Sequence, residues 1–432
     1  MLPFRGARVA MDPGQLLRVM GPASIVVETG RIRVLGAEFG PGSSILVHRY
    51  RSYVVKALER AVLSVRLGEG GAIEKPNPGE EVVDAWERIA EEIASNGRFV
   101  AMVTGPVDSG KTSLATMIAN VALGKGLRVA VVDIDVGQGD LSPPGFIALK
   151  YLEKPVTWLR LEKGDSLRFV GGITPVHNPY YTRLMVGAVD LVNEARERGC
   201  QAIVVNTGGW VTGINAVEMK IELAYAIRAS HVVVLDEVLC KRIGSAIGSS
   251  IKVICAPRPK VVRERNRADR RELRRHQYMR FFQSAKRICV DLSSVVVIGS
   301  CALSGRKLCA EELPSEVAHV LSRVHASLYE HDDILVLWSR RDVPSDAISK
   351  LRAAMGREVF VVTPASAKGL LCAVLDENLR VASPGIIDSI DLDSGELCIY
   401  TEHSGRVGGV IIGRIKLGEN WDEVARLPRC PL

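Results

Sequence analysis

The chain has 432 residues, of which 47% are hydrophobic and 24% are charged. This composition excludes a disordered tail or a fibrous repeat, and the length allows two to four domains. The net charge is +7, and residues 258–280 alone contain ten Lys or Arg against three Asp or Glu. One segment thus carries the whole excess of charge, which predicts that the protein meets a polyanion at one place.

Residues 1–78 predict a β-rich N-terminal domain. Short alternating runs separated by glycines extend from Gly21 to about Ile73, which is the pattern of half-buried strands. Residues 74–80 contain two prolines and a glycine and predict a linker. Apolar residues at helical spacing follow and end at Asn96-Gly97, so we expect a helix that leads into the next domain.

Residues 79–290 predict an α/β domain. From residue 98 onward, continuous apolar strands alternate with helical stretches, which is typical of a parallel sheet covered on both faces. Residues 291–432 have a mixed pattern that becomes strand-like between residues 369 and 417. They predict a small, β-rich C-terminal domain.

The strongest motif is GPVDSGKT, which begins at Gly105 and fits GxxxxGK[ST] between an apolar strand and a helix. This context favours a phosphate-binding loop over a simple glycine turn, and hence a P-loop NTPase core. Backbone N–H groups and the helix N-terminus would face the phosphates of a nucleoside triphosphate, Lys111 would contact the β and γ phosphates, and Thr112 would ligate Mg²⁺. The residues expected to bind the nucleotide are Gly105, Asp108, Ser109, Gly110, Lys111, Thr112 and Ser113.

The next strand ends in DIDVGQGD, residues 133–140. Alternation along the strand places Asp133 and Asp135 on the same side, at the sheet edge where open α/β folds bind ligands. One carboxylate can hold the metal ion, and the other can accept a proton from an attacking hydroxyl. The alternative is a surface turn rich in Asp and Gly.

Two further segments carry candidate binding residues. Trp210 follows Thr207 and two glycines at the end of a strand, where it can stack on a base or pack in the core. Residues 171–177 form a glycine-proline turn ahead of a helix.

The basic segment contains arginines every four residues, so on a helix they form one stripe: Arg263, Arg267, Arg271 and Arg275. Like charges at this spacing destabilise a helix unless an anion relieves them. We therefore favour an anion-binding role over a solvated helix face, and we expect the helix to be poorly ordered until phosphates bind.

In this order and spacing, GPVDSGKTS, DIDVGQGD, VNTGGW, the Thr-Pro turn and the arginine-rich segment resemble the polynucleotide 5′-hydroxyl kinases. This family includes the RNA 5′-kinase of mRNA 3′-end processing, the pre-ribosomal RNA kinases and their archaeal relatives. The resemblance covers nearly the whole chain and implies transfer of the γ-phosphate of ATP to the 5′-OH of RNA, with DNA as a further substrate. It identifies residues 258–282 as a lid and the Thr-Pro turn as a clasp on the nucleic acid.

The resemblance also implies roles for individual residues. Lys111, Asp133, Asp135, Arg267 and Arg271 would be catalytic, with Asp135 favoured as the residue that activates the 5′-OH, and Thr112 and Asp133 would hold the metal ion. The substrate would be bound by Gln138, Thr174, Pro175, His177, Thr207, Trp210 and Arg263.

Two other functions are compatible with a P-loop. The chain could be an ATP-bound, non-catalytic scaffold of an RNA-processing complex, but the carboxylate pair and the basic lid favour activity. A GTPase is disfavoured because no NKxD motif occurs, although Ser366-Ala-Lys368 looks like a fragment of a guanine loop. We expect a nuclease or ligase as partner protein.

The remaining expectations concern the environment of the protein. No stretch of about 18 uninterrupted apolar residues occurs, so we expect a cytoplasmic protein that does not bind membranes. The nine cysteines all lie beyond residue 199 and include no CxxC pair. We therefore expect neither a disulfide framework nor a zinc ribbon.

Overall fold

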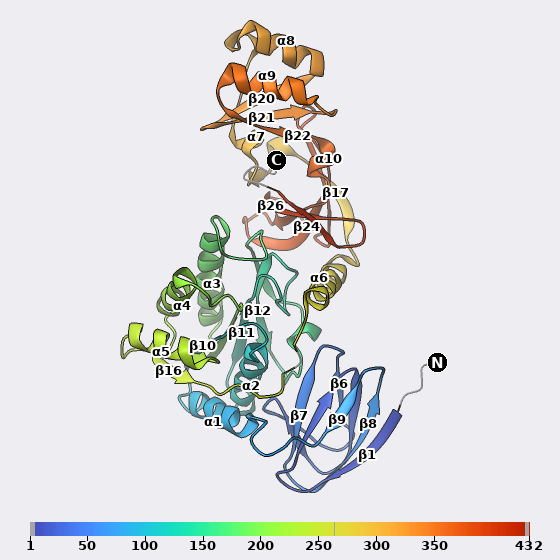
Figure 1. The fold of residues 1–432 in the computed structure, drawn as a ribbon, viewed down its shortest axis with the longest axis vertical. Coiled ribbons are helices and arrows are strands. Elements are labelled where there is room, and N and C mark those ends of the chain that lie inside the picture. The colour runs from blue at the N-terminus through green and yellow to red at the C-terminus, as the bar shows by residue number, and fades with distance from the viewer. Residues whose placement is uncertain (1–4, 263, 428–431) are drawn as a thin grey trace. The chain divides into compact units, whose positions relative to one another are not determined.

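The computed structural model describes residues 5–262, 264–427 and 432. These residues form two compact units, which Figure 1 follows from blue to red. The first unit comprises the described residues of Met1–Ser142, Ile147–Asp165 and Leu184–Arg270. The second comprises those of Pro143–Phe146, Ser166–Arg183 and Arg271–Leu432. No helix in these described ranges is long and apolar enough to cross a bilayer.

The N-terminal part of the first unit is β-rich, as the sequence predicts, and consists of antiparallel strands. Their order is β1-β8-β3-β6 in one sheet and β5-β4-β7-β2-β9 in the other. Side chains alternate between buried and more exposed positions, and the buried ones form one apolar core. The strands are β1 (Arg5–Met11), β2 (Leu16–Met20), β3 (Ala23–Thr29), β4 (Ile32–Val34), β5 (Ala37–Phe39), β6 (Ser44–Val47), β7 (Ser52–Ala57), β8 (Ala61–Leu67) and β9 (Ala72–Glu74).

The rest of the first unit is an α/β core with the strand order β12-β11-β14-β10-β15-β16. Neighbouring strands are parallel except β12, which is antiparallel to β11, so the sheet is not wholly parallel as expected. No helix separates β11 from β12, and a parallel pair needs such a crossover. The strands are β10 (Phe99–Thr104), β11 (Val129–Ile134), β12 (Phe146–Leu152), β14 (Ala202–Thr207), β15 (His231–Val234) and β16 (Lys252–Cys255).

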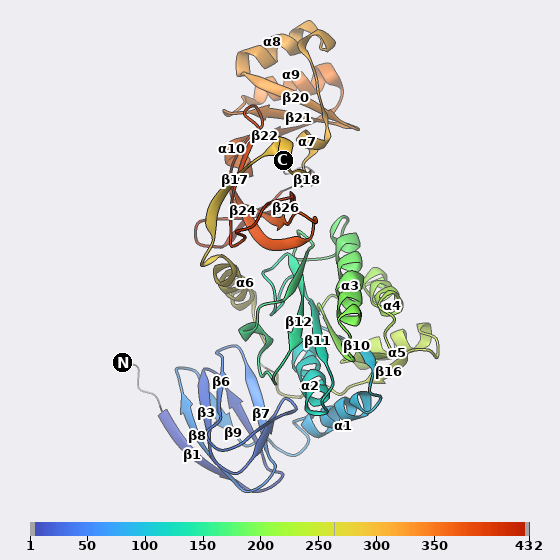
Figure 2. The ribbon, with the colours of Figure 1, turned by 180° about the vertical axis from the view of Figure 1, so that it is seen from behind.

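The order of the strands determines on which face of the sheet each helix of the core lies. The chain passes from β10 to β11 in one direction along the sheet, and from β14 through β15 to β16 in the other. Right-handed crossovers therefore place α2 on one face and α4 and α5 on the other, and Figures 1 and 2 show α4 and α5 together. The carboxyl ends of β10, β11 and β14 meet at one edge. The helices are α1 (Val83–Ala94), α2 (Lys111–Gly124), η1 (Leu159–Leu161), α3 (Tyr180–Glu197), α4 (Ile214–Ala226) and α5 (Glu237–Ala246).

The second unit contains two sheets, with the orders β17-β25-β24-β23-β26-β18 and β19-β20-β21-β22. Both sheets contribute to one apolar core, and the other face of the smaller sheet packs with α8 and α9 in a second core. Its strands are β13 (Ser166–Phe169), β17 (Lys286–Asp291), β18 (Val296–Ile298), β19 (Arg306–Lys307), β20 (Ala326–His331), β21 (Ile334–Ser339), β22 (Glu358–Val362), β23 (Leu370–Leu375), β24 (Val381–Asp391), β25 (Glu396–Thr401), β26 (Gly409–Leu417) and β27 (Glu423–Arg426). Its helices are α6 (Arg267–Phe282), which begins in the first unit, η2 (Leu292–Ser294), α7 (Cys301–Ser304), η3 (Ala310–Glu312), α8 (Ser315–Val324), α9 (Ser345–Met355) and α10 (Pro364–Ala367).

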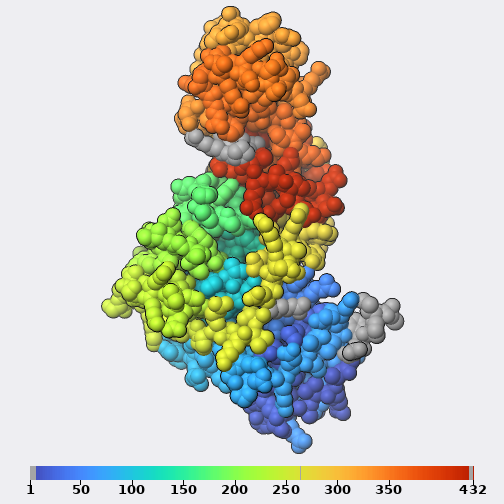
Figure 3. Space-filling view, viewed as in Figure 1, coloured from blue at the N-terminus to red at the C-terminus, as the bar shows by residue number. Residues whose placement is uncertain are grey.

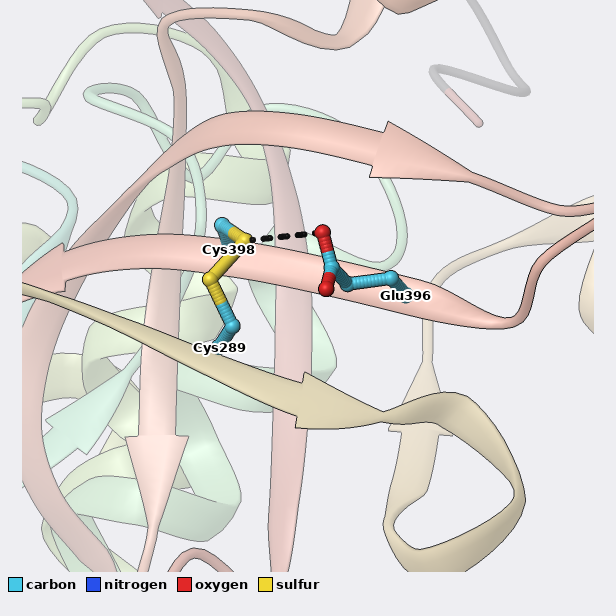
Figure 4. A group of neighbouring side chains, drawn as sticks. All are labelled: Cys289, Glu396 and Cys398. Carbon is cyan, nitrogen blue, oxygen red and sulfur yellow. Dashed lines mark hydrogen bonds between the residues drawn. A yellow bond between two sulfur atoms is a disulfide. The ribbon is translucent and has the colours of Figure 1, made fainter.

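The expectation that the chain has no disulfides is wrong, since Cys240 is bonded to Cys255 and Cys289 to Cys398. Cys289 and Cys398 stand opposite each other in the β17–β25 pair, a proximity that the spacing of cysteines cannot reveal. Figure 4 shows this disulfide beside Glu396, whose Oε1 is 3.5 Å from Sγ of Cys398. Because the two sulfurs are bonded to each other, these three residues do not form a metal site.

Candidate nucleotide and phosphoryl-transfer site

The P-loop joins β10 to α2, where the sequence places it. Gly110 has a φ of +96°, and a Cβ at this position would lie 2.7 Å from Cη2 of Trp86. Trp86 belongs to α1, and its Nε1 donates to the carbonyl of Pro257 at 2.8 Å. The helix that leads into the core therefore covers one side of the loop and ties it to the start of the basic segment.

Lys111 is the buried cation of the loop. Its Nζ donates to the carbonyl of Pro106 at 2.6 Å. Burial lowers the pKa of Lys111 to about 8, although the carboxylates of Asp135 and Asp108 oppose the shift. The hydroxyl of Ser109 is also buried and has no hydrogen-bond partner in the part of the chain that the structure describes. An ammonium and an unpaired hydroxyl are donors that phosphate oxygens accept, so the loop fits the phosphates of a nucleotide.

Asn206, at the end of β14, links the two residues predicted to hold a metal ion. Its Nδ2 donates to Oδ1 of Asp133 at 3.0 Å and to Oγ1 of Thr112 at 3.3 Å. Its own Oδ1 is buried without a hydrogen-bond partner among the described residues. Carboxylate, hydroxyl and amide oxygens are ligands of hard divalent cations, and this cluster can hold such a cation beside the P-loop.

Asp133 and Asp135 have different surroundings. Asp133 is 1% exposed, its Oδ1 accepts from Asn206 and from the backbone N–H of Asp135, and its Oδ2 accepts from the N–H of Asp140 at 2.6 Å. Burial and the nearby carboxylates of Asp140 and Asp135 raise the pKa of Asp133 to about 7. Asp135 is partly exposed and uses Oδ1 for the N–H groups of the following turn, at 3.0 and 3.1 Å. Its Oδ2 has no hydrogen bond to any described residue and is available to a substrate.

Asp140 anchors the end of the DIDVGQGD segment. Its carboxylate lies 2.5 Å from Nη2 of Arg51 and accepts from Nε of Arg160 at 3.0 Å. Burial alone would raise the pKa of Asp140, but these two guanidinium groups hold it below its usual value. Since Arg51 belongs to the β-rich part of the first unit, the N-terminal strands help to fix the carboxylate segment.

Lys220 of α4 is a second buried cation, which no motif predicts. It is 1% exposed, and its Nζ donates to the carbonyl of Gly208 at 3.2 Å. Burial and the charge of Lys111 lower the pKa of Lys220 to about 7, while Asp135 opposes the shift. A Cβ on Gly208 would lie only 3.6 Å from Oδ1 of Asp135. Lys220 thus holds the main chain next to the predicted base.

The turn after β14 packs directly against the P-loop. A Cβ on Gly209 would lie 2.9 Å from both Cα and N of Val107, so only glycine fits there. Thr207 is buried, and its Oγ1 lies 3.4 Å from the carbonyl of Gly208. Trp210 is partly exposed and is not a core residue, so the structure leaves part of its side chain accessible to a ligand.

Two arginines of the basic segment reach the P-loop. Nη2 and Nε of Arg265 lie 2.6 and 2.9 Å from Oδ1 of Asp108, and Nη2 of Arg270 lies 3.0 Å from Oδ2. Burial alone would raise the pKa of Asp108, but Arg265 and Arg270 hold it below its usual value. Nε2 of Gln138 donates to the carbonyl of Arg270 at 3.2 Å, which joins the segment to the turn after β11.

The arginines predicted to be catalytic lie elsewhere in the segment. Arg267 begins α6, is exposed and has no ion pair in the described ranges. Arg271 pairs with Asp422 at 3.1 Å within the second unit, and Arg263 lies outside the described residues. The helix is formed over 16 residues, and carboxylates from distant parts of the chain pair with three of its arginines. That the helix is poorly ordered until phosphates bind stays a prediction. Figure 3 shows the segment in yellow at the surface.

The clasp turn belongs to the second unit. Thr174 and His177 are exposed, whereas Pro175 is buried. The carbonyl of His177 accepts from the N–H of Tyr180, at the start of α3. The contact of these residues with a nucleic acid stays a prediction.

Sequence reasoning overlooked four residues of the site. Asn206 directly precedes Thr207 in the VNTGGW motif, and a polar side chain at the end of an apolar strand is a usable signal. Lys220 interrupts an apolar helix face, which is also a signal, though a weak one. The arginines that meet the P-loop depend on the path of the chain before α6, which their spacing does not encode. The four residues are Asn206, Lys220, Arg265 and Arg270.

Comparison with known proteins shows which sequences this chain resembles. Residues 105–284 match the family model of the P-loop of the mRNA cleavage and polyadenylation factor CLP1. The chain is 27% identical over 340 residues to a polyribonucleotide 5′-hydroxyl-kinase of Pyrococcus abyssi. This alignment covers 76% of this chain and 90% of the relative. It is 28% identical over 356 residues to a kinase of the same name from Thermococcus kodakarensis. This alignment covers 81% of this chain and 97% of the relative.

A solved structure extends the similarity to the whole fold. Clp1p in the Clp1p–Pcf11p complex matches 95% of this chain and 98% of its own chain, with a TM-score of 0.63 and 14% sequence identity. At this identity the match concerns the fold. Residues 105–284 thus match the CLP1 P-loop family, and the archaeal relatives extend the sequence similarity over most of the chain.

Proposed function

We propose that the protein is an ATP-dependent polynucleotide 5′-hydroxyl kinase that phosphorylates the 5′ end of RNA. The observation that carries this proposal is the pair of hydrogen bonds through which Asn206 joins Thr112 of the P-loop to Asp133. They gather a buried set of oxygen ligands for Mg²⁺ next to Lys111. Asp135 stands beside this set with a free carboxylate oxygen. A nucleotide-binding protein without transfer activity would need no such base.

Each residue of the site has a different role in phosphoryl transfer. ATP with Mg²⁺ supplies the phosphoryl group and neutralises its charge in such reactions. Lys111 binds the β and γ phosphates, and Thr112 and Asp133 hold the metal ion. Asp135 accepts the proton of the 5′-OH while the 5′ oxygen bonds to the γ phosphorus and the bond to the β–γ bridging oxygen breaks. Little further covalent chemistry is needed, so positioned charge is the main contribution.

The lid supplies the remaining positive charge. Arg265 and Arg270 are paired with Asp108 of the P-loop. A nucleotide in the loop offers them phosphate oxygens, which arginine binds in bidentate fashion. We therefore assign the role of lid arginines to Arg265 and Arg270. The sequence predicts this role for Arg267 and Arg271 instead, and substitution of these two arginines tests the assignment.

Residues of several segments would hold the nucleic acid. Trp210 offers an accessible ring on which a base can stack. The clasp and the turn after β11 provide further contacts. Gln138 belongs to the turn after β11, and Thr174, Pro175 and His177 belong to the clasp. Thr207 at the end of β14 and Arg263 of the lid complete the proposed contacts.

The product suggests the class of partner. A 5′-phosphate is the end that a ligase consumes, and a 5′-OH is the end that a nuclease must supply, so we propose one of these enzymes as partner. The cytoplasmic location expected from the sequence stays a prediction.

The direct test is an end-labelling assay. The protein is incubated with γ-labelled ATP, Mg²⁺ and 5′-OH oligonucleotides of RNA and of DNA, and label at the 5′ end is measured. We expect labelling of RNA and its loss in Lys111→Ala, which should still fold because Lys111 binds phosphates and supports no apolar core. Nucleotide binding without any labelling would instead indicate a scaffold. Competition by GTP would reveal a GTPase.

A further inference from the structure

A cavity of about 300 Å³ lies wholly within the second unit. This volume is at the lower end of the range of small-molecule sites. The cavity opens to solvent and is lined by residues of the α3 start, of α7 and of β20 and β26. Among them are Tyr180, Arg183, Ser300, His331, Gly413 and Arg414.

The wall of the cavity carries uncompensated positive charge. Arg183 and Arg414 both line it, and no Asp or Glu does. Neither guanidinium has an ion pair among the described residues. The two acids next to His331 in the chain have other partners, because Glu330 pairs with Arg306 and Arg357, and Asp332 lies 3.4 Å from Nδ1 of His331. Burial and the charge of Arg414 together lower the pKa of Arg183. Two like charges that share a partly buried cavity are unfavourable until an anion joins them.

Aromatic rings hold the two arginines in place. The guanidinium of Arg414 lies 5.8 Å from the centre of the Tyr180 ring, and that of Arg183 lies 6.0 Å from the centre of the Phe169 ring. These contacts orient the planar groups without neutralising them. Nη1 of Arg183 donates to the carbonyl of Val170 at 3.5 Å. The other guanidinium N–H groups of Arg183 and those of Arg414 have no hydrogen-bond partner among the described residues and can bind an external acceptor.

The backbone around the cavity is closely packed. A Cβ on Gly413 would lie 2.7 Å from the carbonyl of Leu371 and 2.8 Å from Cζ of Phe169. Gly171, at the start of the clasp turn, accepts from the N–H of Arg414 at 3.5 Å. The cavity wall and the clasp are therefore parts of one structure, because the clasp residues 174–177 lie between Gly171 and Tyr180 in the chain.

We propose that this cavity, the Arg183–Arg414 pocket, binds an internal phosphate of the polynucleotide substrate. Phosphodiester oxygens are the acceptors that paired guanidiniums recognise. Continuity with the clasp favours a phosphate of the bound strand over a free phosphate ion. The inference rests on the proposed function, and it adds a contact beyond the 5′-terminal nucleotide.

The test compares substrates of different length. Steady-state rates are measured with 5′-OH RNA of about three and about twenty nucleotides, long enough to reach several protein subsites. The variants are Arg414→Gln and Arg183→Gln, which remove charge and keep a polar side chain. Arg380→Gln is the matched control, because Arg380 is exposed in the same unit and does not line the pocket.

We expect both pocket variants to raise the KM of the long RNA about tenfold. This factor corresponds to the loss of one hydrogen bond to a charged group. The kcat and the KM of the short RNA should not change. The salt dependence of binding to the long RNA should become shallower by about one phosphate contact. The control should match the parent protein throughout. An unchanged KM for the long RNA, or an equal rise for both lengths, would overturn the proposal.

Two further measurements separate the possible failures. Fluorescence anisotropy with labelled long RNA reports binding even if no phosphoryl transfer occurs, so the pocket can be tested independently of the kinase activity. Titration with inorganic phosphate tests whether the pocket binds a free phosphate ion instead of a phosphate of the RNA. If inorganic phosphate binds the parent more tightly than the pocket variants but does not compete with the long RNA, the pocket is a free-anion site and the polynucleotide assignment is wrong. Thermal melting of each variant identifies any loss of folding, and Arg414→Lys then serves as the milder substitution.

Discussion

Arg265 donates to Asp108 with an Nη2–Oδ1 distance of 2.6 Å, so a carboxylate of the P-loop holds an arginine of the lid. Arg270 binds the other oxygen of the same carboxylate. The carboxylate of Asp108 thus neutralises the guanidinium groups of two arginines at the position where the phosphates would bind. The carboxylate therefore stands in for phosphate and keeps the arginines at the site.

This contact predicts which arginines act in catalysis. Arg265→Ala and Arg270→Ala should each lower kcat by about 10²- to 10³-fold, the loss expected for one group that stabilises transition-state charge. Arg267→Ala is the control, since Arg267 is exposed at the start of α6. The measurement is the steady-state rate of 5′ end labelling. If Arg267→Ala and Arg271→Ala lose kcat while Arg265→Ala does not, the expectation from the sequence is correct and the assignment from geometry fails.

The two carboxylates of β11 should respond differently to the same substitution. Asp135→Asn should lower kcat by about 10²- to 10⁴-fold, the usual contribution of a general base, and should keep ATP affinity. Asp133→Asn should instead raise the Mg²⁺ concentration required for half-maximal rate. Asn206→Ala should shift the Mg²⁺ requirement in the same direction, because it removes the group that bridges Asp133 and Thr112. Full activity of Asp135→Asn together with an inactive Asp133→Asn would reverse the roles.

Much of this site could be predicted from the sequence because its motifs are local. The P-loop and DIDVGQGD each follow an apolar strand, and parallel strands bring their carboxyl ends to one edge. The β-rich N-terminal part was predictable from Gly21 onward, but β1 and β2 were not anticipated, since glycines and prolines mask their short alternation. The partners of the lid arginines were hidden for a different reason: Asp108 and Asp422 lie far away in the chain. The same holds for Cys289 and Cys398, which only strand pairing brings together.

Trp210 should contribute to RNA binding and little to stability. Trp210→Ala should raise the KM for RNA by an amount equivalent to about 1 to 3 kcal/mol of lost stacking, with unchanged ATP affinity. Trp158→Ala is the contrasting variant, because Trp158 is buried and its ring packs on His48 at 4.6 Å. It should lower the melting temperature. A fall in melting temperature for Trp210→Ala without a change in KM would show that Trp210 is a packing residue.

Lys220 predicts how stability depends on pH. Burial and the charge of Lys111 lower its pKa to about 7 in the folded protein, against 10.5 for an ordinary lysine. Below pH 7 the group is protonated in both the folded and the unfolded state, and folding bears the full cost of burying a charge. Between these two pKa values only the unfolded state keeps the proton, so the stability of the folded protein should rise with pH.

Lys220→Met removes this titration with little change in volume. The difference in the free energy of unfolding between parent and variant should therefore shift in favour of the parent as pH rises from about 7 to about 10, by at most about 1.4 kcal/mol per pH unit. Urea unfolding without nucleotide measures it. Lys241→Met is the control, because Lys241 is exposed and its hydrogen bond with Glu237 raises its pKa. A constant difference between parent and Lys220→Met across this range would mean that Lys220 keeps an ordinary pKa, and its hydrogen bond to Gly208 would then be that of a charged lysine at all these pH values.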